Sequence, residues 1–120
     1  LNMFKKVNVP VLGIIENMAY FTPAELPENK YYIFGKEGAK HLAEDLNVPF
    51  LGEIPLVQSI REAGDIGRPA AMQTATQIEE AFEEITKNVV QQVVDRNENL
   101  PATEAIKITT MAGCSAVNKK

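Results

Sequence analysis

Two short apolar segments with nearly the same sequence restrict the fold of this chain more than any other feature. Residues 8–15 read NVPVLGII and residues 47–54 read NVPFLGEI. Near-continuous apolar runs are typical of strands that are covered on both faces, as in parallel sheets. A proline near the start of each run is tolerated because the ladder of hydrogen bonds has not yet begun there. We therefore predict two adjacent parallel strands, residues 9–16 and 48–54, each entered from a preceding helix.

The segments around these runs predict the remaining elements of an α/β fold. Residues 36–46 and 77–94 each carry an apolar stripe at helical spacing. Thr76 and Glu79 form a capping box at the start of the second helix. Two aromatic runs within residues 18–34 flank a polar tip that contains prolines, which predicts a small hairpin insertion.

The chain divides into one domain portion and a tail. Residues 1–97 hold all of the predicted elements, whereas the end of the 98–120 tail is small and polar and is expected to be disordered. Two strands alone leave one flank of the sheet without a partner. We expect that flank to be covered by self-association, by strand exchange, or by residues 105–110 folding back.

Composition excludes several classes of function. The chain has 120 residues with 12 basic and 16 acidic side chains, and this balance argues against a broad nucleic-acid-binding face. No apolar run approaches the roughly 18 residues that a membrane span needs. The single cysteine, Cys114, excludes an internal disulfide. We expect a cytoplasmic protein, and the first residue, Leu1, suggests a piece of something longer.

The polar residues that follow the two strands mark a candidate ligand site. In an open parallel sheet, ligands bind beyond the carboxyl ends of the strands. Asn17 follows the first strand and Pro55-Leu56 the second, so these residues are expected at one edge. The Asn17 amide offers the acceptor and donors that would read an adenine edge, and the apolar pair would support the ring. The alternatives are that Asn17 closes a turn and that Pro55 ends the strand.

Other side chains give weaker signals. His41 lies among charged residues on a predicted helix, which favours a solvated face. Cys114 lies in a stretch of small residues and is more simply explained as an exposed thiol than as a ligand. The sequence has no glycine-rich phosphate loop and no complete set of catalytic residues.

Four sequence motifs together resemble the C-terminal part of the Mrp/ApbC family. These are VPVLGIIENMAYF at residues 9–21, IFG at 33–35, VPFLGEIPL at 48–56 and IREAGDIGRP at 60–69. The family comprises P-loop ATPases of the MinD/ParA-like group that act as iron–sulfur cluster carriers. The resemblance covers residues 1–97 in order and implies a fragment of a parallel-sheet P-loop NTPase fold.

The resemblance also implies which residues bind what. Asn17 would recognise adenine, and the turn at Ile54, Pro55 and Leu56 would pack near the base. The phosphate loop, the switch regions and the Mg²⁺ ligands of the family come earlier in the polypeptide. ATP and Mg²⁺ would therefore be bound by the parent protein, an ATP hydrolase, whereas this chain alone holds no catalytic residue and would be inactive.

The hairpin tip departs from the family pattern. Many relatives carry a Cys-x-x-Cys pair between the ENM-x-YF and IFG motifs, and two subunits then hold one cluster. Residues 22–30 here read TPAELPENK and contain no cysteine. Carboxylates such as Glu25 and Glu28 are poor substitutes for thiolates. Cys114, one per subunit, would supply at most two ligands.

These observations predict the C-terminal part of an ATP-binding iron–sulfur cluster carrier. The parent protein would be a homodimer that meets recipient or scaffold proteins. Two alternatives stay open. The chain could be a non-catalytic interaction module that uses its aromatic hairpin and long helix, or part of a ParA-like partitioning ATPase.

Overall fold

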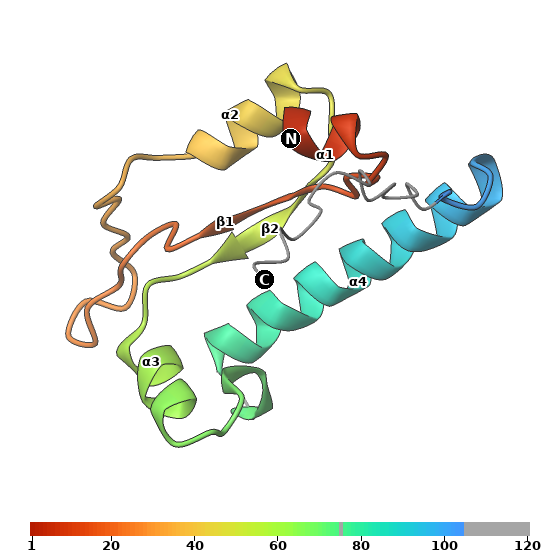
Figure 1. The fold of residues 1–120 in the computed structure, drawn as a ribbon. Helices are drawn as coiled ribbons and strands as arrows, with labels where there is room; N and C mark the ends of the chain where they lie inside the picture. The colour runs from red at the N-terminus through yellow and green to blue at the C-terminus, as the bar shows by residue number, and fades with distance from the viewer. Residues whose placement is uncertain (75, 105–120) are drawn as a thin grey trace, which may run out of the picture.

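The computed structural model describes residues 1–74 and 76–104 and confirms the α/β class. The elements along the chain are α1 (Asn2–Lys6), β1 (Ile14–Asn17), α2 (Gly38–Asp45), β2 (Phe50–Ile54), α3 (Gln58–Asp65), the 3₁₀ turn η1 (Ala70–Met72) and α4 (Gln77–Asn99). In the view of Figure 1, α2 lies above the two strands and the long helix α4 below them. The strands therefore form the middle of a layered arrangement with helices on either side.

The two strands are parallel neighbours, as the sequence predicts. Ile14 lies opposite Phe50 and Asn17 lies opposite Ile54, so both strands end at the same edge. The register shifts between Ile14 and Ile15, where β2 contributes one extra residue. That irregularity places Gly52 at a φ of 144°, a backbone conformation that favours glycine.

Matching helix ends explain the repeated Asn-Val-Pro pattern. Asn8 follows α1 and Asn47 follows α2, with φ values of 55° and 51° in the left-handed region that asparagine tolerates. The next amides, of Val9 and Val48, donate back to carbonyls inside the preceding helices at 2.9 Å. This is the Schellman motif, which satisfies the free carbonyls at a helix end. The repeat therefore marks two helix-to-strand junctions of the same geometry.

The core lies where α4 packs against β2. Ile85 of α4 faces Gly52 so closely that a Cβ on this glycine would lie 2.6 Å from Ile85 Cγ1. The Asn88 Nδ2 atom donates to the Leu51 carbonyl at 2.9 Å, which ties α4 to the backbone of β2. The start of α4 is capped as predicted, since the Thr76 hydroxyl accepts from the Glu79 amide at 3.2 Å. The buried apolar side chains are Ala19, Tyr20, Ala43, Leu51, Ala63, Ile78 and Ile85.

Several boundaries differ from the sequence-based expectations. β1 begins at Ile14 and not at residue 9, because its first ladder bond runs from the Ile14 amide to the oxygen of Pro49, which itself has no N–H to extend the ladder. α4 continues to Asn99, beyond its apolar stripe, and stops just before Pro101. α3 ends at Asp65 and is followed by a left-handed glycine, Gly67.

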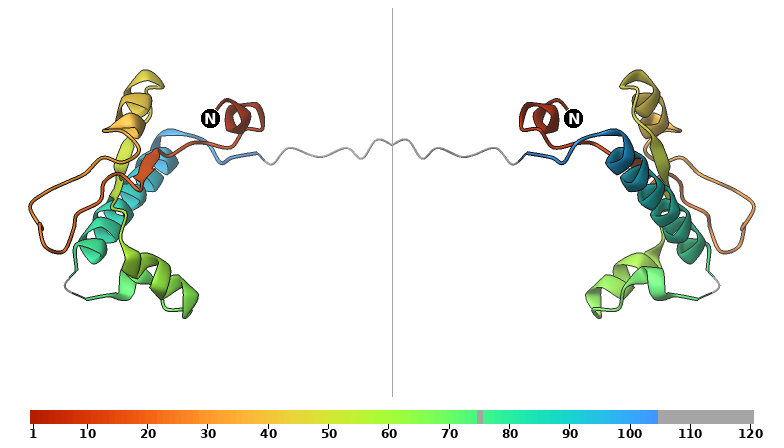
Figure 2. Two further views of the ribbon diagram at one scale, coloured as in Figure 1. Left: turned by 90° about the vertical axis from the view of Figure 1, so that its left-hand side faces the viewer. Right: turned by 90° about the vertical axis from the view of Figure 1, so that its right-hand side faces the viewer.

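The insertion between β1 and α2 contains the expected pair of arms. They meet in one antiparallel bridge, in which the Phe21 and Tyr31 amides each donate to the other's carbonyl at 2.9 and 2.8 Å. Both side views show this loop extending outward beyond the helices (Figure 2). Residues 105–110, the segment expected to fold back onto the sheet flank, lie outside the described residues.

Gly52 provides a test of the packing between α4 and β2. We expect Gly52→Ala to lower the free energy of unfolding by about 1–3 kcal/mol, because the new methyl group would overlap Ile85 and the backbone is strained for any other residue. Urea unfolding followed by circular dichroism measures the change. Gly64→Ala is the matched control, since nothing lies within 4 Å of its added Cβ and alanine favours α3 by up to about 1 kcal/mol. Equal stability of wild type and Gly52→Ala would contradict this packing.

Candidate functional site at the carboxyl edge of the strands

The carboxyl edge of the strand pair brings the predicted site residues together. Asn17 and Ile54 are register partners at the ends of β1 and β2. Two further hydrogen bonds continue beyond the strands, from the Ala19 amide to the Ile54 carbonyl at 3.0 Å and from the Leu56 amide to the Tyr20 carbonyl at 2.7 Å. The segments after β1 and β2 therefore run side by side as one rim.

Asn17 has both a local bond and free hydrogen-bonding capacity. Its Oδ1 atom accepts from the Met18 amide at 3.0 Å, which accompanies the left-handed φ of 57° at Met18. This bond is the turn-forming role that the sequence left open. The side chain is exposed, and its two Nδ2 hydrogens make no hydrogen bond within the described part of the chain. They remain available to a ligand at the rim.

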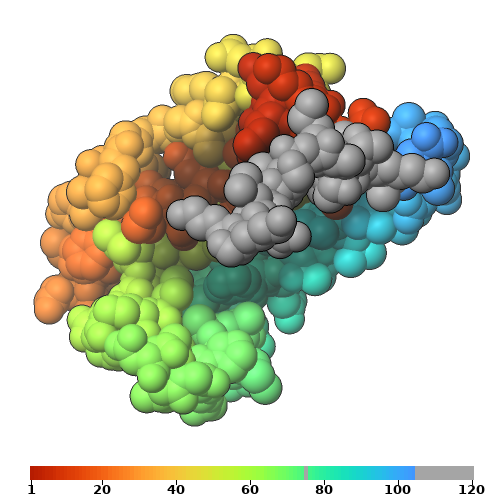
Figure 3. Space-filling view, in the orientation of Figure 1, coloured from red at the N-terminus to blue at the C-terminus, as the bar shows by residue number. Residues whose placement is uncertain are grey.

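A cavity of about 300 Å³ lies beside the rim, between the hairpin tip, the segment after β2 and the start of α4. Figure 3 shows the hairpin and α3 approaching each other on this side of the molecule. Among the four predicted site residues, Pro55 lines the cavity and is buried, whereas Asn17, Ile54 and Leu56 do not line it. None of the lining side chains is charged. They are Thr22, Pro23, Ala24, Pro27, Pro55, Val57, Ser59, Gln73, Thr76, Gln77 and Ile78.

The sequence reading missed the contribution of α4 to this cavity. Gln77, the first residue of α4, lines the cavity, and its Nε2 atom donates to the Tyr20 hydroxyl at 3.1 Å. Its Oε1 atom has no partner among the described residues. The sequence signal that could have identified Gln77 is the Thr76 cap, which marks where α4 begins. Nothing in the sequence places this helix start at the carboxyl edge of the sheet.

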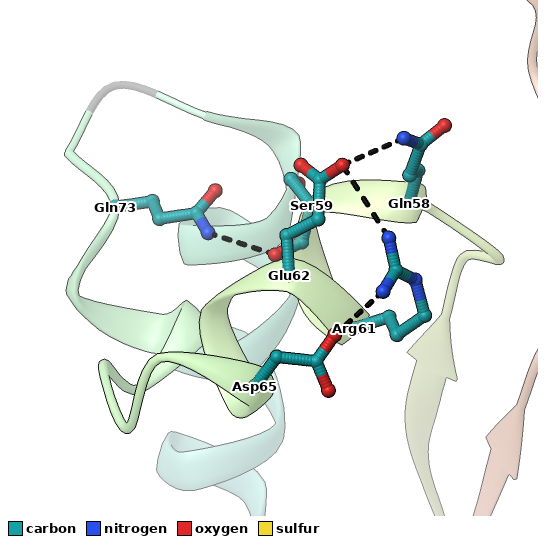
Figure 4. Close-up of polar contacts among 6 residues, drawn as sticks. All are labelled: Gln58, Ser59, Arg61, Glu62, Asp65 and Gln73. Atoms are coloured by element: carbon teal, nitrogen blue, oxygen red, sulfur yellow. Dashed lines mark hydrogen bonds and ion pairs between the residues drawn. The ribbon is translucent and has the colours of Figure 1, made fainter.

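A hydrogen bond from Gln73 holds the wall next to Ser59, and the charged residues of α3 do not line the cavity. Gln73 donates from Nε2 to the Ser59 carbonyl at 3.3 Å (Figure 4). Arg61 pairs with Glu62 and Asp65 at 3.5 and 2.5 Å, and in the view of Figure 4 it lies on the other side of α3 from Gln73. These three charged side chains are more than half exposed, so their pairs contribute little to stability.

A cluster around Tyr20 connects the hairpin to the strands. The Tyr20 ring is buried, and the Lys30 ammonium lies 3.8 Å from its centroid in a cation–π contact. Lys30 also pairs with Glu53 of β2 at 3.6 Å. Burial by itself lowers the pKa of Lys30, whereas its hydrogen bond and charge interaction with Tyr20 raise it. Attraction from Glu53 and Tyr32 adds to them, so the pKa of Lys30 lies above its usual value of 10.5.

The remaining candidates stay outside the site. His41 is exposed on α2, as expected of a solvated helix face. Cys114 lies outside the described residues. Within residues 1–74 and 76–104, no three His, Cys, Asp or Glu side chains gather as a metal site would require. None of the helices in the same part of the chain has the length and apolar character that a membrane crossing requires.

The parallel strands and the helices around them match part of a solved nucleotide-binding protein. A solved nucleotide-binding protein from Archaeoglobus fulgidus, in complex with ADP, superposes with a TM-score of 0.50 at 36% sequence identity. The match covers 56% of this chain and 27% of that structure. The family model described as NUBPL iron-transfer P-loop NTPase matches residues 1–90. The chain belongs to this family, which confirms the Mrp/ApbC-type resemblance.

Relatives named for iron–sulfur cluster transfer are similar over most of the chain. The iron–sulfur cluster transfer protein NUBPL of Dictyostelium discoideum is 39% identical over 82% of this chain, and that of Mus musculus is 42% identical over 76%. The iron–sulfur cluster carrier protein of Synechocystis is 49% identical over 58%. These matches cover 31%, 28% and 20% of the relatives, so the chain spans less than a third of their length.

Lys30 makes the cluster around Tyr20 sensitive to pH. Because its folded-state pKa is raised, the stability that its charge contributes is present below pH 10.5 and is lost as the pH rises through the folded-state pKa. We expect Lys30→Met to lower the free energy of unfolding by about 0.5–1 kcal/mol at pH 7, and this difference to shrink at higher pH. Thermal unfolding at a series of pH values checks it. Lys36→Met is the control, since Lys36 lies farther from its ring, at 5.4 Å from Tyr32. A difference that persists unchanged well above pH 10.5 would exclude the charged contact.

Proposed function

We propose that this chain is the C-terminal part of an ATP-binding iron–sulfur cluster carrier and that it supplies the wall against which the adenine base lies. The observation that carries the proposal is the parallel pairing of β1 and β2, which puts Asn17 and Pro55 at one edge beside an uncharged cavity. Ligands of open parallel sheets bind beyond this edge. The family membership and the ADP complex of the Archaeoglobus protein support a nucleotide as the ligand.

The chemistry of the cavity suits a purine base. A neutral flat ring loses little solvation on entering a cavity whose lining carries no charge, and the proline rings of Pro23, Pro27 and Pro55 offer apolar surfaces for it. The Gln77 carbonyl can accept a hydrogen bond from an exocyclic amino group, and the Asn17 amide can donate from the rim. A volume of about 300 Å³ leaves room for a purine base.

The phosphates and Mg²⁺ of ATP do not fit among the described residues. No glycine-rich loop with a Lys-Ser/Thr ending occurs in the sequence, and the residues described hold no cluster of three carboxylates or other metal ligands. We assign these groups to the part of the parent protein that the relatives contain and this chain does not span. Within this chain we therefore assign no catalytic residue, and its contribution is to bind and orient the base.

Exposed apolar side chains and open strand edges support a position inside a larger domain. Ile15, in the middle of β1, is 40% exposed, and Val90 of α4 is 57% exposed. Within the described residues the sheet has only β1 and β2, so each strand has an edge that could accept another strand. We propose that further strands of the P-loop domain, and in the assembled carrier a second subunit, cover this surface.

In such a carrier the iron–sulfur cluster would be the cargo. The hairpin tip, where many relatives carry a cysteine pair, has no cysteine in this sequence. We propose that a carrier built from this chain holds its cluster through thiolates other than that pair and passes it to recipient proteins. Cys114 is the one thiolate ligand that this chain could offer.

A non-catalytic interaction module is the second candidate, and a specific observation favours it. The outer arm of the hairpin exposes consecutive large side chains, with Ile33 59% and Phe34 69% accessible. A protein partner could bury such a surface. The two candidates differ in whether the cavity binds adenosine.

Titration with adenosine tests the proposed base site directly. We expect the isotope-labelled chain to bind adenosine with a Kd on the order of 1 mM, because base contacts without phosphate contacts give only a few kcal/mol. NMR chemical-shift changes should centre on the side-chain amides of Gln77 and Asn17, and uridine should bind more weakly. Gln77→Ala should weaken adenosine binding about 3- to 10-fold.

Gln91→Ala is the control for this titration. Gln91 belongs to the same helix but bonds to Asp95, away from the cavity. Adenosine shifts spread evenly over the surface, or an identical affinity for both glutamine variants, would remove the cavity from the nucleotide site and favour the interaction module.

A further inference from the structure

We propose that Tyr20 is a positioning residue that couples the base cavity to the hairpin, so that adenine binding stabilises the closed hairpin. The inference rests on the proposed base site, but each of its contacts is independent of the ligand. Tyr20 does not line the cavity. It would act through Gln77 on one side and through Lys30 on the other.

On the cavity side, Tyr20 fixes the side chain that would read the base. The Gln77 Nε2 atom donates to the Tyr20 hydroxyl at 3.1 Å, which leaves the Gln77 carbonyl as the acceptor for a ligand. The Tyr20 backbone carbonyl accepts from the Leu56 amide at 2.7 Å, directly after Pro55. One residue thus holds both the α4 wall and the β2 wall of the site.

On the hairpin side, the same ring holds the returning arm. Lys30, next to the bridge residue Tyr31, lies 3.8 Å from the Tyr20 ring centroid and pairs with Glu53 at 3.6 Å. Tyr32 packs edge-on against Tyr20 with the ring centroids 6.3 Å apart. The first arm continues directly from Tyr20 into Phe21, so both arms of the hairpin are tied to this one ring.

The position of Tyr20 makes these two sets of contacts interdependent. Its side chain is 5% exposed, so it cannot change place without disturbing both neighbours. The hairpin tip also supplies Thr22, Pro23 and Pro27 to the cavity lining. A base held by this lining would favour the closed hairpin, and by linkage a closed hairpin would favour the base to the same extent.

Hydrogen exchange of the Phe21 and Tyr31 amides, which form the bridge, tests this coupling in the full chain. Adenosine should slow their exchange in the wild type. Lys30→Met should speed it several-fold without ligand and weaken adenosine binding about 2- to 5-fold, although Lys30 does not line the cavity. Lys30→Arg should restore both properties, and Lys36→Met should change neither.

Tyr20→Phe separates the two sides of the coupling. It keeps the ring under Lys30 but removes the hydroxyl, which holds Gln77 and also interacts with Lys30, so exchange without adenosine should rise less than in Lys30→Met. Adenosine should bind about 3- to 10-fold more weakly, and its effect on the bridge amides at equal occupancy should fall. Wild-type adenosine affinity in both Lys30→Met and Tyr20→Phe would overturn the coupling.

Failure of the base site gives a different result. If the wild type binds no adenosine, the proposed function fails, yet faster bridge exchange in Lys30→Met would still establish the contact of Tyr20 with the hairpin. If the wild type binds adenosine but the bridge amides do not respond to it, the base site stands and the coupling is wrong.

Discussion

The parallel pairing of β1 and β2 is the constraint on which the rest of the structure depends. Because both strands point the same way, the segments that leave them emerge at one edge and are joined there by further backbone hydrogen bonds. The fit between Gly52 and Ile85 allows α4 to lie close against β2, and this helix then begins at the same edge. If either condition were absent, Pro55 and Gln77 would not line one cavity beside the rim that carries Asn17.

The candidate site is built from uncharged groups, and this character supports the proposed role in binding a base. Its prolines and amides suit the proposed binding of a flat neutral ring, whereas none of its lining side chains carries the positive charge that would neutralise a triphosphate. Such a division is physically reasonable, since base recognition needs shape and a few hydrogen bonds, while phosphoryl transfer needs concentrated positive charge. The Tyr20 cluster adds a connection from this neutral site to the hairpin, through contacts that would not be recognised from the cavity alone.

Sequence patterns predicted the parallel strands, the connecting helix, the hairpin and the capped long helix, because each depends on local periodicity or on a single capping residue. The same patterns placed Asn17 and Pro55 at one edge. They did not reveal Gln77, because its role depends on where α4 begins in space, and they extended β1 too far, because the missing N–H of Pro49 limits the ladder from the opposite strand. The cluster of Tyr20, Lys30 and Glu53 joins three segments that are separate in the sequence. No local sequence pattern in any of these segments predicts the contact.

The twin Schellman junctions have a consequence for how this part of the chain can diversify. Each strand is positioned by the helix end directly before it, at Asn8 or at Asn47. The loop between β1 and α2 therefore takes no part in deciding where either strand starts. Residues at the tip of this insertion can therefore change between thiols, carboxylates and aromatic rings without altering where β1 and β2 begin. A cysteine-free tip on an otherwise family-like frame is the outcome that this separation permits.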